Sequence, residues 1–352
     1  MRFRSPKRLK PAKRPKNLRA AVVTLAVALA ACLGLATPAQ AAFEPALPRL
    51  NITDTYITGI SSGGFMASQL QVAYSGTFKG AGVFAAGPYY CGKGGIVTGL
   101  IACGTGLIST DPEGIEQIAR RWSREGKIDP VANLAGKPVY TYHGTKDPLV
   151  QDRVSDEGVQ FYRDFGARTL YHDTDPAGHG WPTPYAPLPC GWTFYPFLIN
   201  CGNDPQGEML RHWLGDGNVK APAATQTGTL TEHDQDRYTP GGWAQWYSLG
   251  TKNFLYTPKS CARGAECKLV VALHGCLSDN KFVGSRFARE SHLNEYADTN
   301  NLVILYPQTD ISIARLNPQG CWDWWGYTGS DYAQKSAPQM RAIVNQIHAL
   351  GG

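Results

Sequence analysis

The chain has 352 residues, of which 43% are hydrophobic and 11% aromatic, so it can bury a substantial core and is not a disordered protein. Its formal net charge of +6 depends on the N-terminus, because nine of the 34 lysines and arginines precede residue 20 and the first acidic residue is Glu44. Without residues 1–41, 25 basic side chains stand against 28 acidic ones, a net charge of −3. This balance argues against a nucleic-acid partner, which needs a basic surface.

The first 41 residues have the three parts of a secretory signal peptide. A basic segment up to Arg19 is followed by an apolar run at residues 20–36, and Ala39-Gln40-Ala41 forms a small-residue cleavage site. The apolar run is shorter than the roughly 20 residues of a membrane span, so we expect export rather than a stable membrane anchor. A lipoprotein-like motif ends at Cys32, but the apolar run continues beyond it, which favours cleavage after Ala41 over lipidation.

Eight cysteines remain after this cleavage, and an even number in an exported protein predicts disulfide bonds. Three pairs are close in the chain, which leaves the last two cysteines for each other, although spacing alone does not fix the connectivity. Zinc is the alternative, but no C-x-x-C pair or nearby histidine cluster supports a metal site. The expected pairs are Cys91 with Cys103, Cys190 with Cys201, Cys261 with Cys267, and Cys276 with Cys321.

A nucleophile motif lies near the start of the mature chain. Residues 53–73 run from a β-rich segment through Gly59-Ile60-Ser61-Ser62-Gly63 into a helical pattern. This is G-x-S-x-G, which places the hydroxyl of the central Ser61 on a sharp turn between strand and helix. The backbone N–H of Ser62, at the helix N-terminus, is suited to stabilise an oxyanion. A glycine-rich turn without a catalytic role is the alternative for the motif alone.

The following segments alternate between strand and helix patterns: a strand at 80–87, a helix at 112–126, a strand at 138–144, a helix at about 154–165 and a strand at 167–172. Asp147 follows the strand at 138–144, where α/β sheets place functional groups, and His179 lies in a glycine-flanked loop after the last strand. The order Ser61, Asp147, His179 is that of α/β hydrolases.

Together these residues provide a nucleophile, a base that removes its proton and a carboxylate that orients the base. Taken singly, Asp147 can be a turn former and His179 an ordinary loop residue. His143 is the alternative base, but a histidine that directly ends a strand is better explained as a packed or hydrogen-bonded core group.

A polar stretch rich in small residues at 215–237 resembles a connector, and strand patterns resume after it at 253–258, 268–273 and 302–306, with a closing helix at 336–350. The strand at 268–273 ends in His274-Gly275-Cys276, an oxyanion-loop pattern that normally precedes the nucleophile turn. Here it follows by more than 200 residues, so we predict a circularly permuted α/β-hydrolase fold, with a mostly parallel sheet and helices on both faces. Residues 42–352 would form one catalytic domain; two domains divided near residue 220 are the alternative.

Five segments, TGISSGGFMASQLQVAYS, HGTKDPLV, AGHGWP, VALHGC and NPQGCWDWWGYTG, resemble the single-domain, circularly permuted extracellular polyhydroxybutyrate depolymerases. The resemblance covers nearly all of the mature chain. It implies Ser61 as nucleophile, Asp147 and His179 as its partners, and an oxyanion hole formed by the N–H groups of Ser62 and Cys276. It also implies the Cys276–Cys321 disulfide.

Aromatic residues gather near this disulfide, and aromatic walls suit an apolar polyester chain. Trp322 is expected in the core, whereas Trp324, Trp325 and Tyr332 are candidates for substrate contacts. Many depolymerases of the wider family append a separate polymer-binding domain. We expect none after Gly352 here, so exposed apolar residues around the Ser61 mouth would adsorb the polymer.

We therefore expect a secreted, monomeric serine hydrolase that cleaves poly(3-hydroxybutyrate) in solid or granule form through an acyl-enzyme, without metal or cofactor. A feruloyl or acetyl esterase acting on plant polysaccharide is the first alternative, because related folds serve both substrate classes. A catalytically silent protein that binds polymer or granules is the second, and the apparently complete triad argues against it.

Overall fold

The computed structural model describes residues 45–352, so the predicted signal peptide at 1–41 lies outside the described residues. Within the described chain, eight strands form one sheet in the order β4-β3-β2-β1-β10-β11-β9-β8. The strands are β1 (Ile52–Ile60), β2 (Phe78–Phe84), β3 (Pro138–Tyr142), β4 (Arg168–His172), β8 (Thr229–Asp234), β9 (Lys252–Thr257), β10 (Cys267–Leu273) and β11 (Leu302–Tyr306). Neighbours from β4 to β11 pair in parallel, and β9 and β8 add an antiparallel edge.

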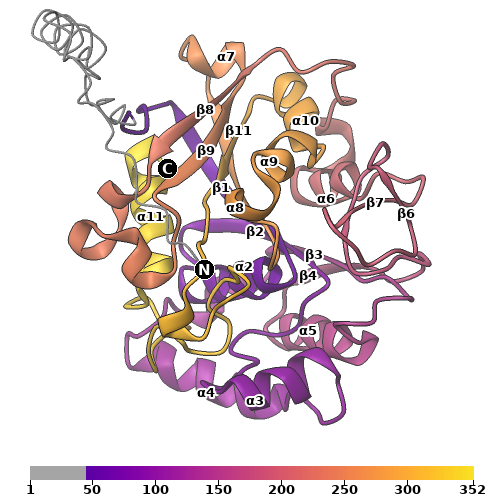
Figure 1. Cartoon of the computed structure of the whole chain (residues 1–352), viewed down its shortest axis with the longest axis vertical. Helices are drawn as coiled ribbons and strands as arrows, with labels where there is room; N and C mark the ends of the chain where they lie inside the picture. The colour runs from indigo at the N-terminus through magenta and orange to yellow at the C-terminus, as the bar shows by residue number, and fades with distance from the viewer. Residues whose placement is uncertain (1–44) are drawn as a thin grey trace, which may run out of the picture. The chain divides into compact units, whose positions relative to one another are not determined.

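Helices cover both faces of this sheet (Figure 1). Buried side chains of α2, α4, α5 and α11 belong to one hydrophobic cluster, and those of α6, α9 and α10 belong to the other. The helices are α2 (Ser62–Ala73), α3 (Ile96–Thr98), α4 (Pro112–Arg124), α5 (Asp152–Asp164), α6 (Pro205–Leu214), α7 (Lys259–Ala262), α8 (Asn280–Val283), α9 (Arg286–Glu290), α10 (Leu293–Asn300) and α11 (Pro338–Leu350).

The central strand β1 shows why the sheet is buried on both sides. Its β-branched and aromatic residues favour an extended chain, and successive side chains point to opposite faces. Ile57 therefore joins the cluster under α2, whereas Tyr56 and Ile60 join the cluster under α6 and α10. All three are less than 9% exposed, as expected for a strand in a parallel sheet.

The pairing of β1 with β10 confirms the permuted arrangement. Thr55 lies opposite Leu269 and Gly59 opposite Leu273, although the strands are more than 200 residues apart in the chain. Both strands therefore end at the same edge of the sheet, which brings the turn after β1 beside the loop after β10. Residues 45–352 lie in one compact unit.

The predicted connector at 215–237 needs a correction, because its second half is not a linker. Residues 229–234 form the edge strand β8, which pairs with β9 from Thr229 opposite Thr257 to Asp234 opposite Lys252. The strand is polar because one of its sides faces solvent at the sheet edge, so its composition resembles that of a loop. The first half crosses α10, where the Ala223 N–H donates to the Glu295 carbonyl at 3.0 Å.

A smaller sheet follows β4 and lies at the right in Figure 1. It contains β5 (Trp181–Pro182), β7 (Leu198–Asn200) and β6 (Leu188–Pro189), in that order. The expected disulfides are all present: Cys91–Cys103, Cys190–Cys201, Cys261–Cys267 and Cys276–Cys321. No helix within residues 45–352 is long and apolar enough to cross a membrane.

Candidate active site

Ser61 occupies a strained turn between β1 and α2. Its φ of 56° and ψ of −124° lie in a region that residues with a side chain rarely adopt, and such strain is commonly found at functional sites. Gly59 and Gly63 must be glycines, because backbone atoms of other residues lie where a side chain would begin. A Cβ on Gly59 would lie 2.4 Å from the Gly63 carbonyl oxygen, and one on Gly63 would lie 2.3 Å from the His274 carbonyl oxygen. The predicted G-x-S-x-G geometry is therefore present.

Asp147 and His179 form a buried hydrogen-bonded pair. The Nδ1 of His179 lies 2.7 Å from Oδ2 of Asp147, and the N–H groups of Leu149 and Val150 donate to Oδ1 at 2.8 and 3.0 Å. Burial alone would raise the pKa of Asp147, but His179 and these two N–H groups outweigh it and lower the pKa. The carboxylate is thus ionised at neutral pH and fixes the proton of His179 on Nδ1, which leaves Nε2 free to accept one.

The cavity beside Ser61 also contains His179 in its wall. Among the described atoms, the Ser61 hydroxyl and the imidazole form no hydrogen bond in this structure. Such contacts are often long in unliganded enzymes and tighten when substrate binds.

His143, the alternative base, is a structural residue. It is 3% exposed, and its Nε2 lies 2.9 Å from the Val150 carbonyl, to which it donates. This bond closes the loop that presents Asp147, because the Val150 N–H donates to the carboxylate on the other side. His143 therefore supports the Asp147 loop and has no access to the cavity, as expected from its position at a strand end.

The loop of His179 is held by the neighbouring disulfide loop. The Gly178 N–H donates to the Cys190 carbonyl at 2.8 Å, and the His179 N–H donates to the Thr193 hydroxyl at 2.7 Å. The Cys190–Cys201 bond closes this second loop. The backbone that carries the imidazole is thus held by two hydrogen bonds to the 190–201 loop.

A second support links the same loop to the helix layer. His172, at the end of β4, lies 2.8 Å from Glu208 of α6 and 3.2 Å from Asp175, which starts the loop that carries His179. The hydrogen bond to Glu208 and the nearby Asp175 raise the pKa of His172 to about 9. His172 is thus charged at neutral pH and bridges two carboxylates.

The loop after β10 forms the opposite wall. Cys276 is joined to Cys321, and the Leu277 N–H donates to the Gln319 carbonyl at 2.8 Å. Within residues 45–352 the Cys276 N–H forms no hydrogen bond, and Ser62 is the first residue of α2, where N–H groups lack intrahelical partners. Both groups are therefore available to an oxyanion.

These walls enclose a cavity of about 240 Å³ at the carboxyl edge of the sheet. Its lining is mostly apolar, with a few polar groups at one side, as in sites for small ligands. The polar and small residues are Ser61, His179, Gly275, Cys276, Ser278 and Gln319, and the apolar ones are Ile60, Leu149, Trp181, Pro196, Phe197, Leu277 and Phe287.

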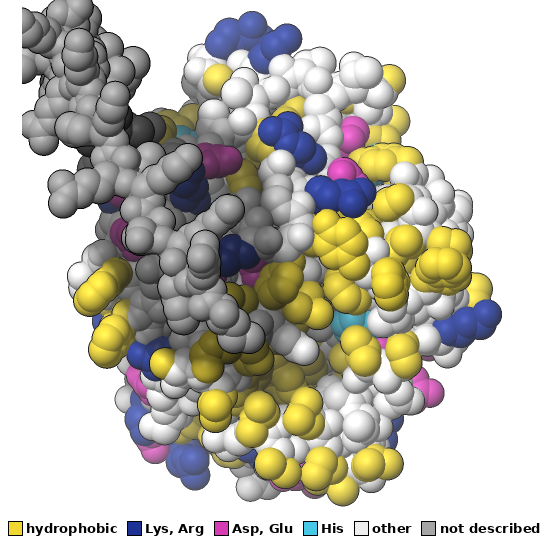
Figure 2. All heavy atoms as spheres, in the orientation of Figure 1, with side chains coloured by type: hydrophobic (Ala, Val, Ile, Leu, Met, Phe, Trp, Pro, Cys, Tyr) yellow, Lys and Arg dark blue, Asp and Glu magenta, His cyan; other side chains and the backbone are white. Residues whose placement is uncertain are grey.

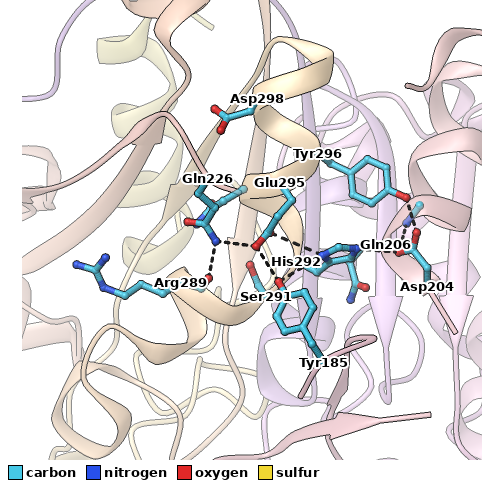
Figure 3. Close-up of polar contacts among 12 residues, drawn as sticks. Tyr185, Asp204, Gln206, Gln226, Arg289, Ser291, His292, Glu295, Tyr296 and Asp298 are labelled. Carbon is cyan, nitrogen blue, oxygen red and sulfur yellow. Dashed lines mark hydrogen bonds and ion pairs between the residues drawn. The ribbon is translucent and has the colours of Figure 1, made fainter. Parts of the chain in front are cut away.

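The turn between α9 and α10 and the start of α10 contact Tyr185, four residues after Trp181 of the cavity wall (Figure 3). The indole N–H of Trp181 donates to the Ser291 carbonyl at 2.9 Å. Tyr185, from the same loop as Trp181, donates to Glu295 at 2.9 Å, and Gln226 of the connector donates to the same carboxylate at 2.8 Å. The connector thus helps to fix the cavity wall from behind.

Known proteins similar to the chain were found both among sequences and among solved structures, although no family model matches it. The poly(3-hydroxybutyrate) depolymerase of Delftia acidovorans is 39% identical over 335 residues, which are 94% of this chain and 65% of that protein. The polyhydroxybutyrate depolymerase of Talaromyces funiculosus is 36% identical over 87% of this chain and 92% of its own length. The chain belongs to the polyhydroxybutyrate depolymerase family.

Solved structures of the family give the same result. The crystal structure of PHB depolymerase from Penicillium funiculosum matches with a TM-score of 0.78 and 34% identity, over 87% of this chain and 98% of that one. A serine-to-alanine variant of PHB depolymerase complexed with an R3HB trimer matches equally well. The predicted α/β-hydrolase fold and the predicted depolymerase family are thus confirmed.

The three aromatic residues predicted to contact substrate do not line the cavity of this depolymerase homologue. Tyr332 is 1% exposed, and Trp325 is 8% exposed. Trp324 is partly buried and stacks on Phe65 of α2, with 5.0 Å between ring centroids. The prediction is therefore wrong for Tyr332, which belongs to the hydrophobic core. Trp325 lines a different hollow, together with Arg315 and Tyr327, and not the Ser61 cavity. Trp322, expected in the core, is fully buried.

Aromatic residues that the sequence analysis missed lie on the 190–201 loop. Pro196 and Phe197 line the cavity, and Trp192, Phe194 and Tyr195 are each about half exposed or more. Hydrophobic side chains gather on this side of the molecule and along its lower edge in Figure 2, over the small sheet and α3. The only sequence signal was the aromatic content of this short disulfide loop. In the described chain, no group of three or more histidine, cysteine or acidic side chains could hold a metal ion.

Proposed function

We propose that the chain is a secreted serine hydrolase that cleaves the ester bonds of poly(3-hydroxybutyrate) and releases short hydroxybutyrate oligomers or monomers. The observation that carries this proposal is the 2.7 Å His179–Asp147 pair in the wall of a cavity that also contains the strained Ser61. The sequence relatives named as depolymerases support the choice of polyester.

The reaction starts when the Ser61 oxygen attacks the ester carbonyl and its proton moves to Nε2 of His179. Asp147 stabilises the resulting imidazolium through Nδ1–H. The negative charge on the carbonyl oxygen is met by the N–H groups of Cys276 and Ser62. Collapse of the adduct breaks the ester C–O bond, and His179 gives its proton to the leaving alcohol. Water then attacks the acyl-enzyme by the same route and releases the acid.

The cavity suits such a substrate because the polymer is neutral and carries small methyl groups. Apolar side chains from both walls, such as Leu149, Phe197 and Leu277, can contact these groups, and no lysine or arginine of residues 45–352 lines the cavity. A charged or heavily hydroxylated substrate would lose hydration there without gaining partners.

The apolar rim gives a means of adsorption to a solid. Trp192 and Phe194 are 55% and 65% exposed on the loop that provides Pro196 and Phe197 to the cavity, and Leu149 of the cavity lining is 52% exposed. Exposed apolar residues around a cleft commonly mark a contact surface. We assign polymer adsorption to this rim.

Four disulfides within residues 45–352 favour an oxidising compartment, which supports export. The three proposed triad residues and both oxyanion donors come from one chain, so the proposed enzyme acts as a monomer. The proposed chemistry needs no cofactor, because the serine, its base and the two N–H groups supply each step.

A clearing assay on a poly(3-hydroxybutyrate) suspension tests the proposal, run beside a soluble butyrate ester and feruloylated xylan. The wild type is expected to clear the suspension and hydrolyse the butyrate ester, and Ser61→Ala to do neither while still binding the particles. Hydrolysis of the soluble ester with a suspension that stays turbid would contradict the depolymerase assignment. Release of ferulate would instead identify a polysaccharide esterase.

A further inference from the structure

His274 lies directly before the oxyanion loop and is completely buried. Its Nδ1 lies 2.7 Å from the carbonyl oxygen of the next residue, Gly275. On the other side of the ring, Nε2 lies 3.3 Å from both the N–H and the hydroxyl of Thr309. Neither the triad nor the oxyanion donors account for these contacts.

The contacts determine which ring nitrogen of His274 carries the proton. The Gly275 carbonyl can only accept, so Nδ1 must donate to it, and the Thr309 N–H can only donate, so Nε2 must accept. This requires a neutral ring. Burial lowers the pKa of His274 to about 4, and the packed neighbours Thr309, Trp322 and Phe287 are all uncharged.

The Gly275 carbonyl and the Cys276 N–H belong to one planar peptide unit and point in opposite directions. A hydrogen bond that fixes the carbonyl on the buried side therefore turns the N–H toward the other side. That side holds the nucleophile, since a Cβ on Gly275 would lie 3.4 Å from the Ser61 Cβ. A glycine before this peptide unit gives little resistance to rotation, so its orientation depends on such a bond.

We propose that His274 is the positioning residue of the oxyanion hole, because its Nδ1–H holds the Gly275–Cys276 peptide unit with the Cys276 N–H directed at the cavity. The inference rests on the proposed ester hydrolysis and adds to it a residue that touches no substrate. The same bond polarises the peptide unit, which makes its N–H a stronger donor to a developing oxyanion.

A matched pair of variants separates the two sides of the ring. Asparagine places an amide N–H near the position of Nδ1 and can still donate to Gly275, whereas glutamine reaches the position of Nε2 and keeps only the Thr309 contact. We expect His274→Gln to lower kcat for a soluble butyrate ester about 10- to 100-fold with little change in KM. This is less than the 10²- to 10³-fold loss when an oxyanion donor is removed outright. His274→Asn should retain most of the activity.

An alkyl boronate inhibitor gives a second measurement, because its adduct mimics the transition state. The Ser61 oxygen adds to boron, its proton moves to His179, and a boron-bound oxygen occupies the oxyanion position. The inhibition constant should rise for His274→Gln in parallel with the loss of kcat/KM and change little for His274→Asn. Melting temperatures of both variants control for general damage to the core.

Equal losses of kcat in the two variants, or losses that follow the melting temperature, would overturn the positioning role. A rise in KM with unchanged kcat would do the same, because it would show an effect on substrate binding alone. If the wild type fails to hydrolyse the butyrate ester, the proposed function fails instead, so the two failures are distinguishable.

Discussion

The two walls of the cavity are held in different ways. In the wall that carries Asp147, the carboxylate is fixed by N–H groups two and three residues further on, and His179 is held by a loop that starts eleven residues later. In the wall that carries Cys276, the partners are Thr309, Gln319 and Cys321, which lie far along the chain. The first wall is built by local contacts and the second by long-range ones.

This difference between local and long-range contacts shows how a circularly permuted chain can keep both walls of the proposed active site. The chemical groups of the first wall come from compact motifs that carry their own supports. The proposed oxyanion donor of the second wall is the Cys276 backbone N–H, whose direction depends on contacts made only after the sheet has formed. Because β1 and β10 pair side by side whatever their order in the chain, the two walls meet in the permuted order as well.

The largest effects are expected in the first wall. Ser61→Ala, His179→Ala and Asp147→Asn should each lower kcat for a soluble butyrate ester by about 10⁴- to 10⁶-fold, because removing one member disables the unit. Folding should be retained, which melting temperatures would check. Near-normal turnover in His179→Ala would mean that another group acts as the base.

The second wall can be loosened without removing its donor. The double variant Cys276→Ala/Cys321→Ala opens a loop of 45 residues and should lower the free energy of unfolding by about 4 kcal/mol, together with a fall in kcat of about 10-fold. Cys261→Ala/Cys267→Ala is the matched control, since its 6-residue loop lies away from the cavity and is worth about 2 kcal/mol. Denaturant unfolding and soluble-ester kinetics measure both. An equal fall in kcat for the control would contradict a special role of the Cys276 bond.

The rim of the first wall should control adsorption rather than chemistry. Trp192→Ser is expected to weaken binding to poly(3-hydroxybutyrate) particles several-fold, because a half-exposed indole loses its apolar contact area. Soluble-ester kcat should change less than two-fold. Trp243→Ser is the control, because Trp243 is similarly exposed at 63% but lies on a loop that contributes no residue to the cavity. If both variants bind particles equally poorly, adsorption is not confined to the mouth.

The smallest effect is expected at His172, which links the first wall to Glu208 of α6. The folded pKa of His172 is raised from 6.5 to about 9, so its ion pairs contribute stability fully below about pH 6.5 and lose it as the pH rises through 9. His172→Gln should therefore lower the free energy of unfolding by about 1 to 2 kcal/mol at pH 6. Urea unfolding from pH 6 to 10 should show the difference from wild type vanish near pH 10. A constant difference would show that packing, not charge, is lost.

The secondary structure was predictable wherever hydrophobic periodicity was strong. The strand at 302–306 matches β11, and the helices expected at 112–126 and 336–350 are present with ends that differ by two residues. The edge strand β8 was missed because solvent covers one of its sides, so polar residues replace the expected alternation. The aromatic residues predicted to contact substrate do not line the cavity, and the sequence could not show this. Closely spaced tryptophans such as those at 322–325 can pack in a core or lie at a surface equally well.

The sequence by itself determined the residues of the proposed chemistry: a serine between glycines after a strand, an aspartate at a strand end and a histidine in a glycine-flanked loop, in hydrolase order. Each of these residues is recognisable from its immediate neighbours, because a sharp turn or a strand end is set by the conformation of only a few residues. Only the tertiary structure decided which aromatic residues face the cavity and that Thr309 meets the ring of His274, the residue proposed to hold the Gly275–Cys276 peptide unit. These features depend on contacts between segments distant in the chain, and a sequence pattern records the residues but not the pairs that folding brings together.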